Sequence, residues 1–446
     1  MMVIGFIEVV IMARKGRSPF IKPNFKKISQ MEDESFQGED IREVIVEHKS
    51  GFNIVEVLII IVVSIAFGVA VGNALSIFRQ EYQGEEVSDS LQELIVVYNN
   101  ILDSYYEDLD EQELADAAIN GMMSSLDDYS MYMDEENATT FNETVDGSYQ
   151  GVGVTITVND DNQFLILDVS ADSPAEKAGI RSNDILTKID GDALDGKSLD
   201  DVTSLVRDSG KEKIIFTLLR DGEELEKEVS LGTVDLVSVL SDVYPLNNGN
   251  AGYIYINSFA ANTYKQFKKE LKKLEKDNIN SLIIDVRSNP GGHLGQTKKI
   301  LELFMNKGST LYQVQFKDDI TKIKDKTKAS KSYPVVVLMN SSSASASEIL
   351  AASFQDSYED ATLIGEKTYG KGTVQTAYSL SDGSSIKYTT EKWLTPKGKW
   401  IDGVGVTPDK NILLTDEYLS NPIPENDFQL QSALDYLESK KNTSEN

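Results

Sequence analysis

The chain has 446 residues, of which 40% are hydrophobic, so it is long enough to form two or three domains with a sizeable core. It contains no cysteine, which excludes disulfides, thiolate nucleophiles and thiolate metal sites. Its formal net charge of −29 argues against a nucleic-acid partner, because phosphate binding needs clustered lysine and arginine side chains. Only His48 and His293 supply imidazole, so any histidine-dependent mechanism or metal site is limited to them.

The first predicted element is a membrane anchor within residues 51–78. Residues 57–78 carry no charged side chain and, at about 1.5 Å per residue, are long enough to cross a hydrocarbon core of about 30 Å. A cleaved signal peptide is the alternative, but its apolar region is usually about 7–15 residues long and lies closer to the N-terminus. We therefore predict one transmembrane helix here.

Basic residues before this stretch predict its orientation. Residues 14–27 contain Arg14, Lys15, Arg17, Lys22, Lys26 and Lys27 and no acidic residue. Positively charged segments tend to stay in the cytoplasm, so we expect residues 1–50 to be cytoplasmic. The rest of the chain would then lie outside the cell membrane, as the extracytoplasmic part of a single-pass protein.

Residues 79–146 are predicted to form a helical segment. Apolar residues recur there at helical spacing, at Val87, Leu91, Leu94, Ile95, Tyr98, Leu114, Ala117, Ala118, Met122 and Leu126. The sequence DGSYQG at 146–151 ends this pattern with residues that are typical of turns.

Residues 147–232 show the pattern of a compact β-rich module with two helices. Short apolar strands alternate with the helical stretches SPAEKAGI and SLDDVTSLVR, and KIIFTLLRDG with ELEKEVSL indicates a hairpin. The order of elements resembles a PDZ domain of the bacterial, circularly permuted kind, most clearly at SPAEKAGIRSNDILTKIDG, residues 173–191.

In PDZ domains an exposed strand edge and a loop of free amides bind an extended peptide and its terminal carboxylate. The matching loop here is Gly151, Val152, Gly153 and Val154, whose glycines permit the close backbone approach that an anion needs. The alternative is that these four residues only begin a buried strand.

Residues 233–440 are predicted to form an α/β core, because strand–loop–helix units follow one another there. In one unit SLIIDVR leads through SNPGG to a helix, and in another YPVVVLMN leads through SSSASAS to EILAASFQD. Functional groups in open α/β sheets gather at the carboxyl ends of the strands. Both unusual loops lie at such ends.

The serine-rich loop at 341–347 suggests nucleophilic chemistry. A serine hydroxyl needs a base and donors for the oxyanion, and a helix start supplies free amides. Serine is also an ordinary helix cap, which is the structural alternative. The base is either His293, in a Ser-His-Asp arrangement, or a neutral lysine, for which Lys367 and Lys371 are near enough in sequence.

Four motifs in one order carry a resemblance to a known family: DVRSNPGG (285–292), SASASEI (343–349), GKGTVQ (370–375) and TPKGKWIDGVGVTPD (395–409). They resemble the carboxyl-terminal processing, or tail-specific, serine peptidases of the S41 type, and the resemblance extends over nearly all of residues 87–439. It implies a multidomain α/β fold. A PDZ domain would be inserted between an N-terminal helical segment and a ClpP/crotonase-like peptidase core.

The resemblance also implies roles for single residues. Ser345 matches the family's nucleophile, Lys371 its general base and Gln375 the residue that orients the base. The backbone amides of Gly292 and Ala346 match the oxyanion hole. The spacing from Ser345 to Lys371 is one residue longer than is usual in the family, which leaves Ser343 and Ser347 as alternative nucleophiles.

The sequence therefore predicts a membrane-anchored, extracytoplasmic serine endopeptidase that cleaves proteins or peptides recognised by their free C-termini. The resemblance implies no metal, nucleotide or other cofactor, and the oligomeric state stays open, with a dimer among the options. Two alternatives remain: a non-catalytic membrane-anchored adaptor that binds C-terminal tails through the PDZ-like module, and an enzyme of the same fold that hydrolyses acyl thioesters.

Overall fold

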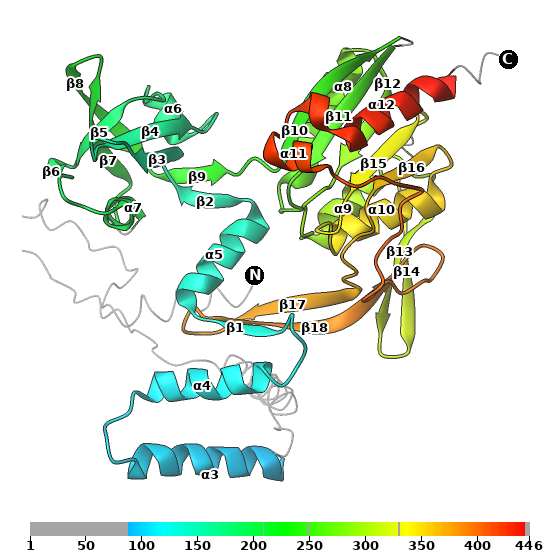
Figure 1. Ribbon diagram of the computed structural model, residues 1–446. Helices are drawn as coiled ribbons and strands as arrows, with labels where there is room; N and C mark the ends of the chain where they lie inside the picture. Colours follow the sequence, from blue (N-terminus) through cyan, green and yellow to red (C-terminus); the bar gives the residue numbers. More distant parts are fainter. Residues whose placement is uncertain (1–87, 208, 248, 329–330, 442–446) are drawn as a thin grey trace, which may run out of the picture. The chain divides into compact units, whose positions relative to one another are not determined.

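The computed structural model describes residues 88–207, 209–247, 249–328 and 331–441 (Figure 1). The predicted cytoplasmic segment at 1–50 and the predicted transmembrane anchor at 51–78 lie outside these residues. Among the helices of the described ranges, none has both the length and the apolar character that crossing a membrane requires.

The N-terminal segment is mainly helical, as its apolar spacing predicts, but it also contains one short strand. Asp110 and Asp134 cap two of its helices, because each carboxylate accepts backbone amides from the first turn. A turn at residues 127–130 leads from the second helix into the strand. The elements are α3 (Asp89–Ser104), α4 (Glu111–Met123), β1 (Met131–Met133) and α5 (Glu135–Asp146).

The β-rich module that follows has its own sheet and its own core. The strand order is β3-β4-β5-β7-β8 with β6 beside β5, and buried residues such as Ile166, Leu186 and Phe216 fill its interior. The predicted hairpin is formed by β7 and β8. The elements are β3 (Val154–Val158), β4 (Phe164–Val169), α6 (Pro174–Lys177), β5 (Ile185–Ile189), β6 (Asp192–Ala193), α7 (Leu199–Arg207), β7 (Lys213–Arg220) and β8 (Glu223–Ser230).

The chain enters and leaves this module through one two-stranded ribbon. In the ribbon β2 (Ser148–Gly151) pairs antiparallel with β9 (Gly232–Asp235), and Gly151 lies opposite Gly232. The stretch GVGVTITV is thus divided between β2 and β3. Gly153 lies between them with a φ of 83°, which favours glycine and interrupts the extended backbone.

The α/β core is built on a six-stranded sheet with the order β10-β11-β12-β15-β16-β19, in which all neighbours except β10 and β11 are parallel. Side chains alternate between its two faces. One face packs against α8, α9 and α10, and the other packs against α12 (Figure 1). The strands are β10 (Val239–Leu246), β11 (Gly249–Ile256), β12 (Ile279–Asp285), β15 (Val335–Met339), β16 (Ala361–Gly365) and β19 (Lys410–Asn411), and the helices are α8 (Thr263–Lys276), α9 (Leu294–Leu301), α10 (Ala346–Ser357), α11 (Asp416–Ser420) and α12 (Phe428–Lys441).

A second sheet consists largely of antiparallel hairpins. Its order is β1-β18-β13-β14, and β17 also pairs with β18. The short strand of the N-terminal segment therefore belongs to the same sheet as the strand that follows Lys371. The further elements are β13 (Thr310–Phe316), β14 (Asp319–Lys324), β17 (Thr373–Ser379) and β18 (Ser385–Leu394).

Candidate active site

The serine-rich loop joins the fully buried strand β15 to α10, at the carboxyl end of the parallel strands. Ser345 is the last residue before the helix, and its φ of 54° lies in a region that is costly for residues other than glycine. A serine is therefore held in a strained conformation where the loop enters the helix.

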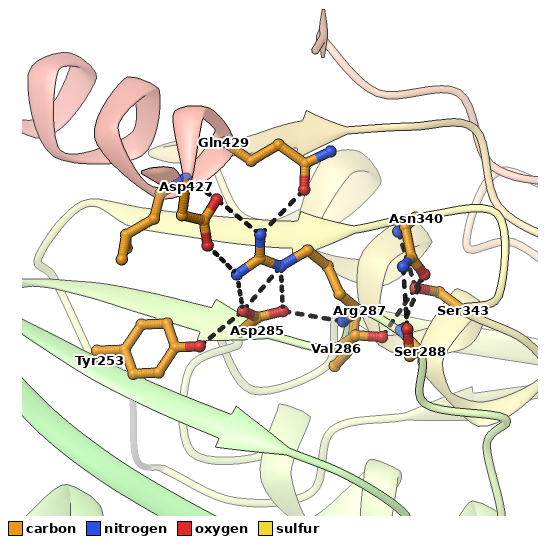
Figure 2. A network of polar contacts seen from close by, with 10 residues as sticks. Tyr253, Asp285, Val286, Arg287, Ser288, Asn340, Ser343, Asp427 and Gln429 are labelled. Carbon is orange, nitrogen blue, oxygen red and sulfur yellow. Dashed lines mark hydrogen bonds and ion pairs between the residues drawn. The ribbon is translucent and has the colours of Figure 1, made fainter. Parts of the chain in front are cut away.

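The neighbouring serines Ser343 and Ser347 are fully buried, and their hydroxyls bond to backbone carbonyls. Ser343 Oγ donates to the carbonyl of Val286 at 2.8 Å, and Ser347 Oγ donates to the carbonyl of Asn289 at 2.9 Å. Asn340 adds a further link, because its side chain bonds to both the amide and the hydroxyl of Ser288 (Figure 2). These hydroxyls fasten the serine loop to the loop that follows β12.

Glu348, in the first turn of α10, links the serine loop to the segment that carries Lys371. Its Oε2 accepts the backbone amides of Ser345 and Lys371, both at 2.8 Å. Its Oε1 accepts the amide of Gly370 at 2.7 Å and the hydroxyl of Thr368. Burial raises the pKa of Glu348, and these four donors act against that rise. One buried carboxyl group thus holds both backbones in a fixed relation.

Two backbone amides next to the serine are free to bind an oxyanion. As the first residue of α10, Ala346 has no acceptor within its own helix. Within the described residues, neither its amide nor that of Gly292 donates to a protein acceptor. Gly291 allows this close approach, since a Cβ there would lie 2.9 Å from the amide nitrogen of Ala346 and 2.7 Å from the carbonyl oxygen of Ala344.

A buried ionic network supports the loop after β12 from the other side (Figure 2). Arg287, which is 8% exposed, donates to the carboxylates of Asp285 and Asp427 and to Gln429. Tyr253 donates to Asp285 at 2.7 Å. The network joins the end of β12 to the start of α12, so the closing helix of the chain stabilises the loop that bears Gly292.

Lys371 lies in a sharp turn before β17, between two glycines that the fold requires. Gly370 has a φ of 94°, and a Cβ on Gly372 would lie 2.6 Å from the indole nitrogen of Trp400. Burial lowers the pKa of Lys371, and the positive charge of Lys387 lowers it further, whereas Asp127 and Glu348 act in the opposite direction. The sum favours a lysine that can lose its proton more easily than one in water.

The amine of Lys371 lies against an aromatic ring in this structure. Its Nζ lies 4.5 Å from the centroid of the Tyr129 ring. In the described part of the chain no hydrogen bond joins Lys371 Nζ to Ser345 or to Gln375. Gln375 Nε2 donates to Thr373 and Thr389 at 3.0 and 2.9 Å, which leaves its carbonyl oxygen available to an ammonium group.

The other two candidate bases lie in different settings. His293 caps α9, because its Nδ1 accepts the amide of Gly295 at 3.1 Å. Lys367 is exposed. Within the described residues, no group of three or more histidine, aspartate or glutamate side chains is placed to hold a metal ion.

The loop Gly151–Val154 lies at the edge of the β-rich module. Its strand β3 is the first in the sheet order and pairs on one side only, with β4. Val152 is buried, its carbonyl accepts the amide of Ala175 in α6, and the carbonyl of Gly153 accepts the amide of Ser170 after β4. An edge strand that follows a glycine loop is the geometry that an added peptide strand needs.

Sequence reasoning did not find Glu348, Asp127 or Tyr129. For Glu348 the signal was present, because Ser-x-x-Glu at a helix start is the pattern of a capping box. For Asp127 and Tyr129 there was no local signal, since each acts on residues more than 200 positions away in the sequence.

Three family models match separate stretches of the chain. Residues 250–412 match peptidase family S41, residues 165–220 match the PDZ domain, and residues 69–137 match the N-terminal domain of the activating protease CtpB. The fold and these matches define a serine peptidase with a PDZ domain.

Several curated proteins are similar in sequence to this chain. The carboxy-terminal processing protease CtpA of Bacillus subtilis strain 168 is 37% identical over 367 residues, which cover 81% of this chain and 77% of that protein. A probable CtpA-like serine protease of Staphylococcus saprophyticus is 37% identical over 342 residues, or 76% of this chain and 68% of that protein. Among solved structures, a photosystem II D1 C-terminal processing protease is 27% identical with a TM-score of 0.42, and the match covers 73% of this chain and 87% of that one. The chain belongs to peptidase family S41, among the CtpA-like carboxy-terminal processing proteases.

Proposed function

We propose that this serine peptidase is a membrane-anchored, extracytoplasmic endopeptidase with a Ser345–Lys371–Gln375 site that cleaves proteins recognised by their C-terminal tails. The observation that carries the proposal is the position of Glu348. A single oxygen of its carboxylate accepts the amides of both Ser345 and Lys371 at 2.8 Å. The hydroxyls of Ser343 and Ser347 are committed to backbone carbonyls, which favours Ser345 as the nucleophile despite the unusual spacing.

In the mechanism, neutral Lys371 removes the proton from Ser345 Oγ as this oxygen attacks the scissile carbonyl. The amides of Ala346 and Gly292 stabilise the oxyanion. The ammonium of Lys371 then protonates the leaving amine, and a water molecule hydrolyses the acyl-enzyme with Lys371 again as base. The side-chain carbonyl oxygen of Gln375 would accept a hydrogen bond from the ammonium of Lys371 and orient it.

The edge of β3 and the loop Gly151–Val154 support the choice of substrate. A peptide that adds to β3 as an extra strand would place its terminal carboxylate at the amides of the loop. The names of the relatives from Bacillus subtilis and Staphylococcus saprophyticus refer to carboxy-terminal processing or to CtpA-like serine proteases. We therefore infer that substrates are proteins or peptides with free C-termini.

Anchoring and orientation rest on the uncharged stretch at 57–78 and on the basic residues before it. We expect the full chain to stay in the membrane fraction after alkaline carbonate extraction. Protease added to intact spheroplasts should remove residues 88–441 and leave an N-terminal tag protected. If the peptidase core were protected from the added protease, the proposed orientation in the membrane would be wrong.

The catalytic proposal is tested by digestion of a protein that bears an apolar C-terminal tail, with products identified by mass spectrometry. The full chain and Ser342→Ala should yield the same peptides, because Ser342 is an exposed residue of the same loop. Ser345→Ala should yield none. If Ser345→Ala still produced peptides, the nucleophile would be another residue. If the unmodified chain bound the tail but produced no peptides, the result would favour the non-catalytic adaptor. A panel of acyl thioesters tests the third alternative.

Recognition of the tail is tested by Gly153→Ala. A Cβ at this position would lie 2.4 Å from the Cβ of Ser173, and the φ of 83° adds strain. The control is Gly196→Ala, which has a φ of 74° but no atom within 4 Å of its added Cβ. Only Gly153→Ala should raise KM for the tailed protein, and kcat/KM for a short peptide should be unchanged in both. Equal losses for tailed and short substrates would contradict tail binding at this loop.

A further inference from the structure

A turn of the N-terminal segment, residues 127–130, contacts the part of the candidate site that contains Lys371 and Gln375. The ring of Tyr129 lies under Lys371, with Nζ 4.5 Å from its centroid. Asp127 accepts a hydrogen bond from Thr389 Oγ1, and Thr389 accepts one from Gln375 at 2.9 Å. The same short turn therefore reaches both Lys371 and Gln375, and no step of the proposed mechanism uses it.

Tyr129 acts on Lys371 as a neutral aromatic ring. The neighbouring hydroxyl of Tyr369, together with burial and nearby acidic groups, raises the pKa of Tyr129 to about 12. The phenol is therefore uncharged at working pH, and its contact with Lys371 is a cation–π interaction. Such a contact stabilises the ammonium and not the neutral amine. Tyr369 in turn donates its backbone amide to the carbonyl of Ser343 at 3.0 Å, so Tyr129 is linked to the serine loop as well.

We propose that Tyr129 is a positioning residue that stores Lys371 as an ammonium against its ring, disengaged from Ser345, and that movement of the turn at 127–130 releases the amine for catalysis. This inference rests on the proposed role of Lys371 as the general base. It assigns to the N-terminal helical segment a regulatory role in the peptidase site, because that segment supplies the turn.

Other groups also act on the protonation of Lys371, and a test must leave them in place. Lys387 on β18 favours the neutral amine, and Asp127 on the turn and Glu348 on α10 favour the ammonium. Asp128 and Asp402 act on the phenol of Tyr129, which they keep protonated. Tyr129→Leu removes the aromatic ring and the hydroxyl, Tyr129→Phe removes the hydroxyl alone, and both changes leave these charged groups in place.

The experiment measures the protonation of Lys371 directly and the activity separately, both with the full chain. An amine-reactive reagent is applied over a range of pH, and mass spectrometry gives the labelling rate of the peptide that contains Lys371. In Tyr129→Leu the labelling midpoint should fall by about 0.5–1 pH unit, because the ammonium has lost its cation–π partner. Tyr129→Phe keeps the ring, and Tyr106→Leu changes a tyrosine that is 80% exposed, so both should label like the unmodified chain.

The pH profile of kcat should change with the labelling. Tyr129→Leu should be about 3–10-fold faster than the unmodified chain on the acid limb, since more of the lysine is neutral there. A loss of structure cannot produce such a gain. An unchanged labelling midpoint in Tyr129→Leu would overturn the inference whatever the activity shows. A shifted midpoint with an unchanged pH profile would support the contact with Tyr129 but overturn Lys371 as the base.

Discussion

The regions around Ser345, the proposed nucleophile, and Lys371, the proposed base, are built in different ways. The serine loop lies at the end of a fully buried parallel strand, and the hydroxyls next to Ser345 bond to backbone carbonyls. Lys371 is half-buried, precedes a strand of the antiparallel sheet and contacts Tyr129 of the N-terminal segment. The serine loop is held by hydrogen bonds within the α/β core. The position of Lys371 depends in addition on side chains from a distant part of the sequence.

This difference indicates that the two regions contribute to the site in different ways. A rigid nucleophile and oxyanion site is ready before substrate arrives, which is how electrostatic stabilisation is most effective. An amine that is held by a ring and a few charges can be moved or retuned at small cost in stability. We therefore expect changes on the serine side to damage folding or activity, and changes on the base side, apart from loss of the amine, to shift the pH dependence.

The largest effect is expected from loss of the base. Lys371→Ala should lower kcat/KM for a tailed substrate by about 10²–10⁴-fold, the range that general acid–base catalysis contributes. Because His293 caps a helix, His293→Ala should keep most of the activity. Steady-state kinetics with both variants checks this, and the reverse order of effects would assign the base to His293.

Arg287→Met should be the most damaging change to stability. It leaves Asp285 and Asp427 buried without their cation, and breaking a buried ionic network in this way costs about 3–5 kcal/mol. Urea unfolding measures the loss in the free energy of unfolding. As a control, Lys213→Met removes an exposed pair with Glu228 and should leave the transition almost unchanged. Equal midpoints for both variants would show that the network does not support the core.

Glu348→Gln should lower kcat by about 10–100-fold, since one of its oxygens is replaced by an NH2 group that faces donors. The backbones of Ser345 and Lys371 then lose their common anchor. Glu366→Gln is the matched control, because within the described residues the Glu366 carboxylate accepts a single long bond, from the amide of Leu414 at 3.3 Å. If kcat of Glu348→Gln equalled that of the control, the anchor would have no catalytic role.

The smallest effect is a shift in pH dependence. Burial and then Lys387 lower the pKa of Lys371, so activity should fall as the pH drops through this depressed pKa and the base becomes protonated. Lys387→Met removes the second cation, raises the pKa of Lys371 and should move the acid limb of kcat to higher pH by about half a unit. Lys387→Arg keeps the charge and should not move it. A shift to lower pH in Lys387→Met would contradict the assignment.

The sequence allowed a good prediction of the fold where the pattern is local. Strand–loop–helix units, the β7–β8 hairpin and the helices α6 and α7 all follow from periodicity and turn residues. The strand β1 inside the helical segment was missed, because three residues carry too little periodicity. The strand β2 was missed as well, because Ser148–Gly151 lies within DGSYQG, whose residues are typical of turns.

The site was predictable only in part. The motifs around Ser345 and Lys371 are contiguous in the sequence, so the resemblance could suggest roles for these two residues. The partners that tune them come from other segments: Asp127 and Tyr129 from the N-terminal turn, and Asp427 from the start of α12. Such long-range contacts are decided by the packing of whole elements, which no local pattern encodes.

The ribbon of β2 and β9 has an evolutionary consequence. Because Gly151 and Gly232 face each other across it, the two ends of the PDZ module meet at neighbouring backbone positions, about 5 Å apart in an antiparallel pair. A tight turn of two residues spans such a gap. During evolution the module can thus be deleted, or replaced by one with a different peptide specificity. Neither change would alter the spacing of residues within the peptidase core.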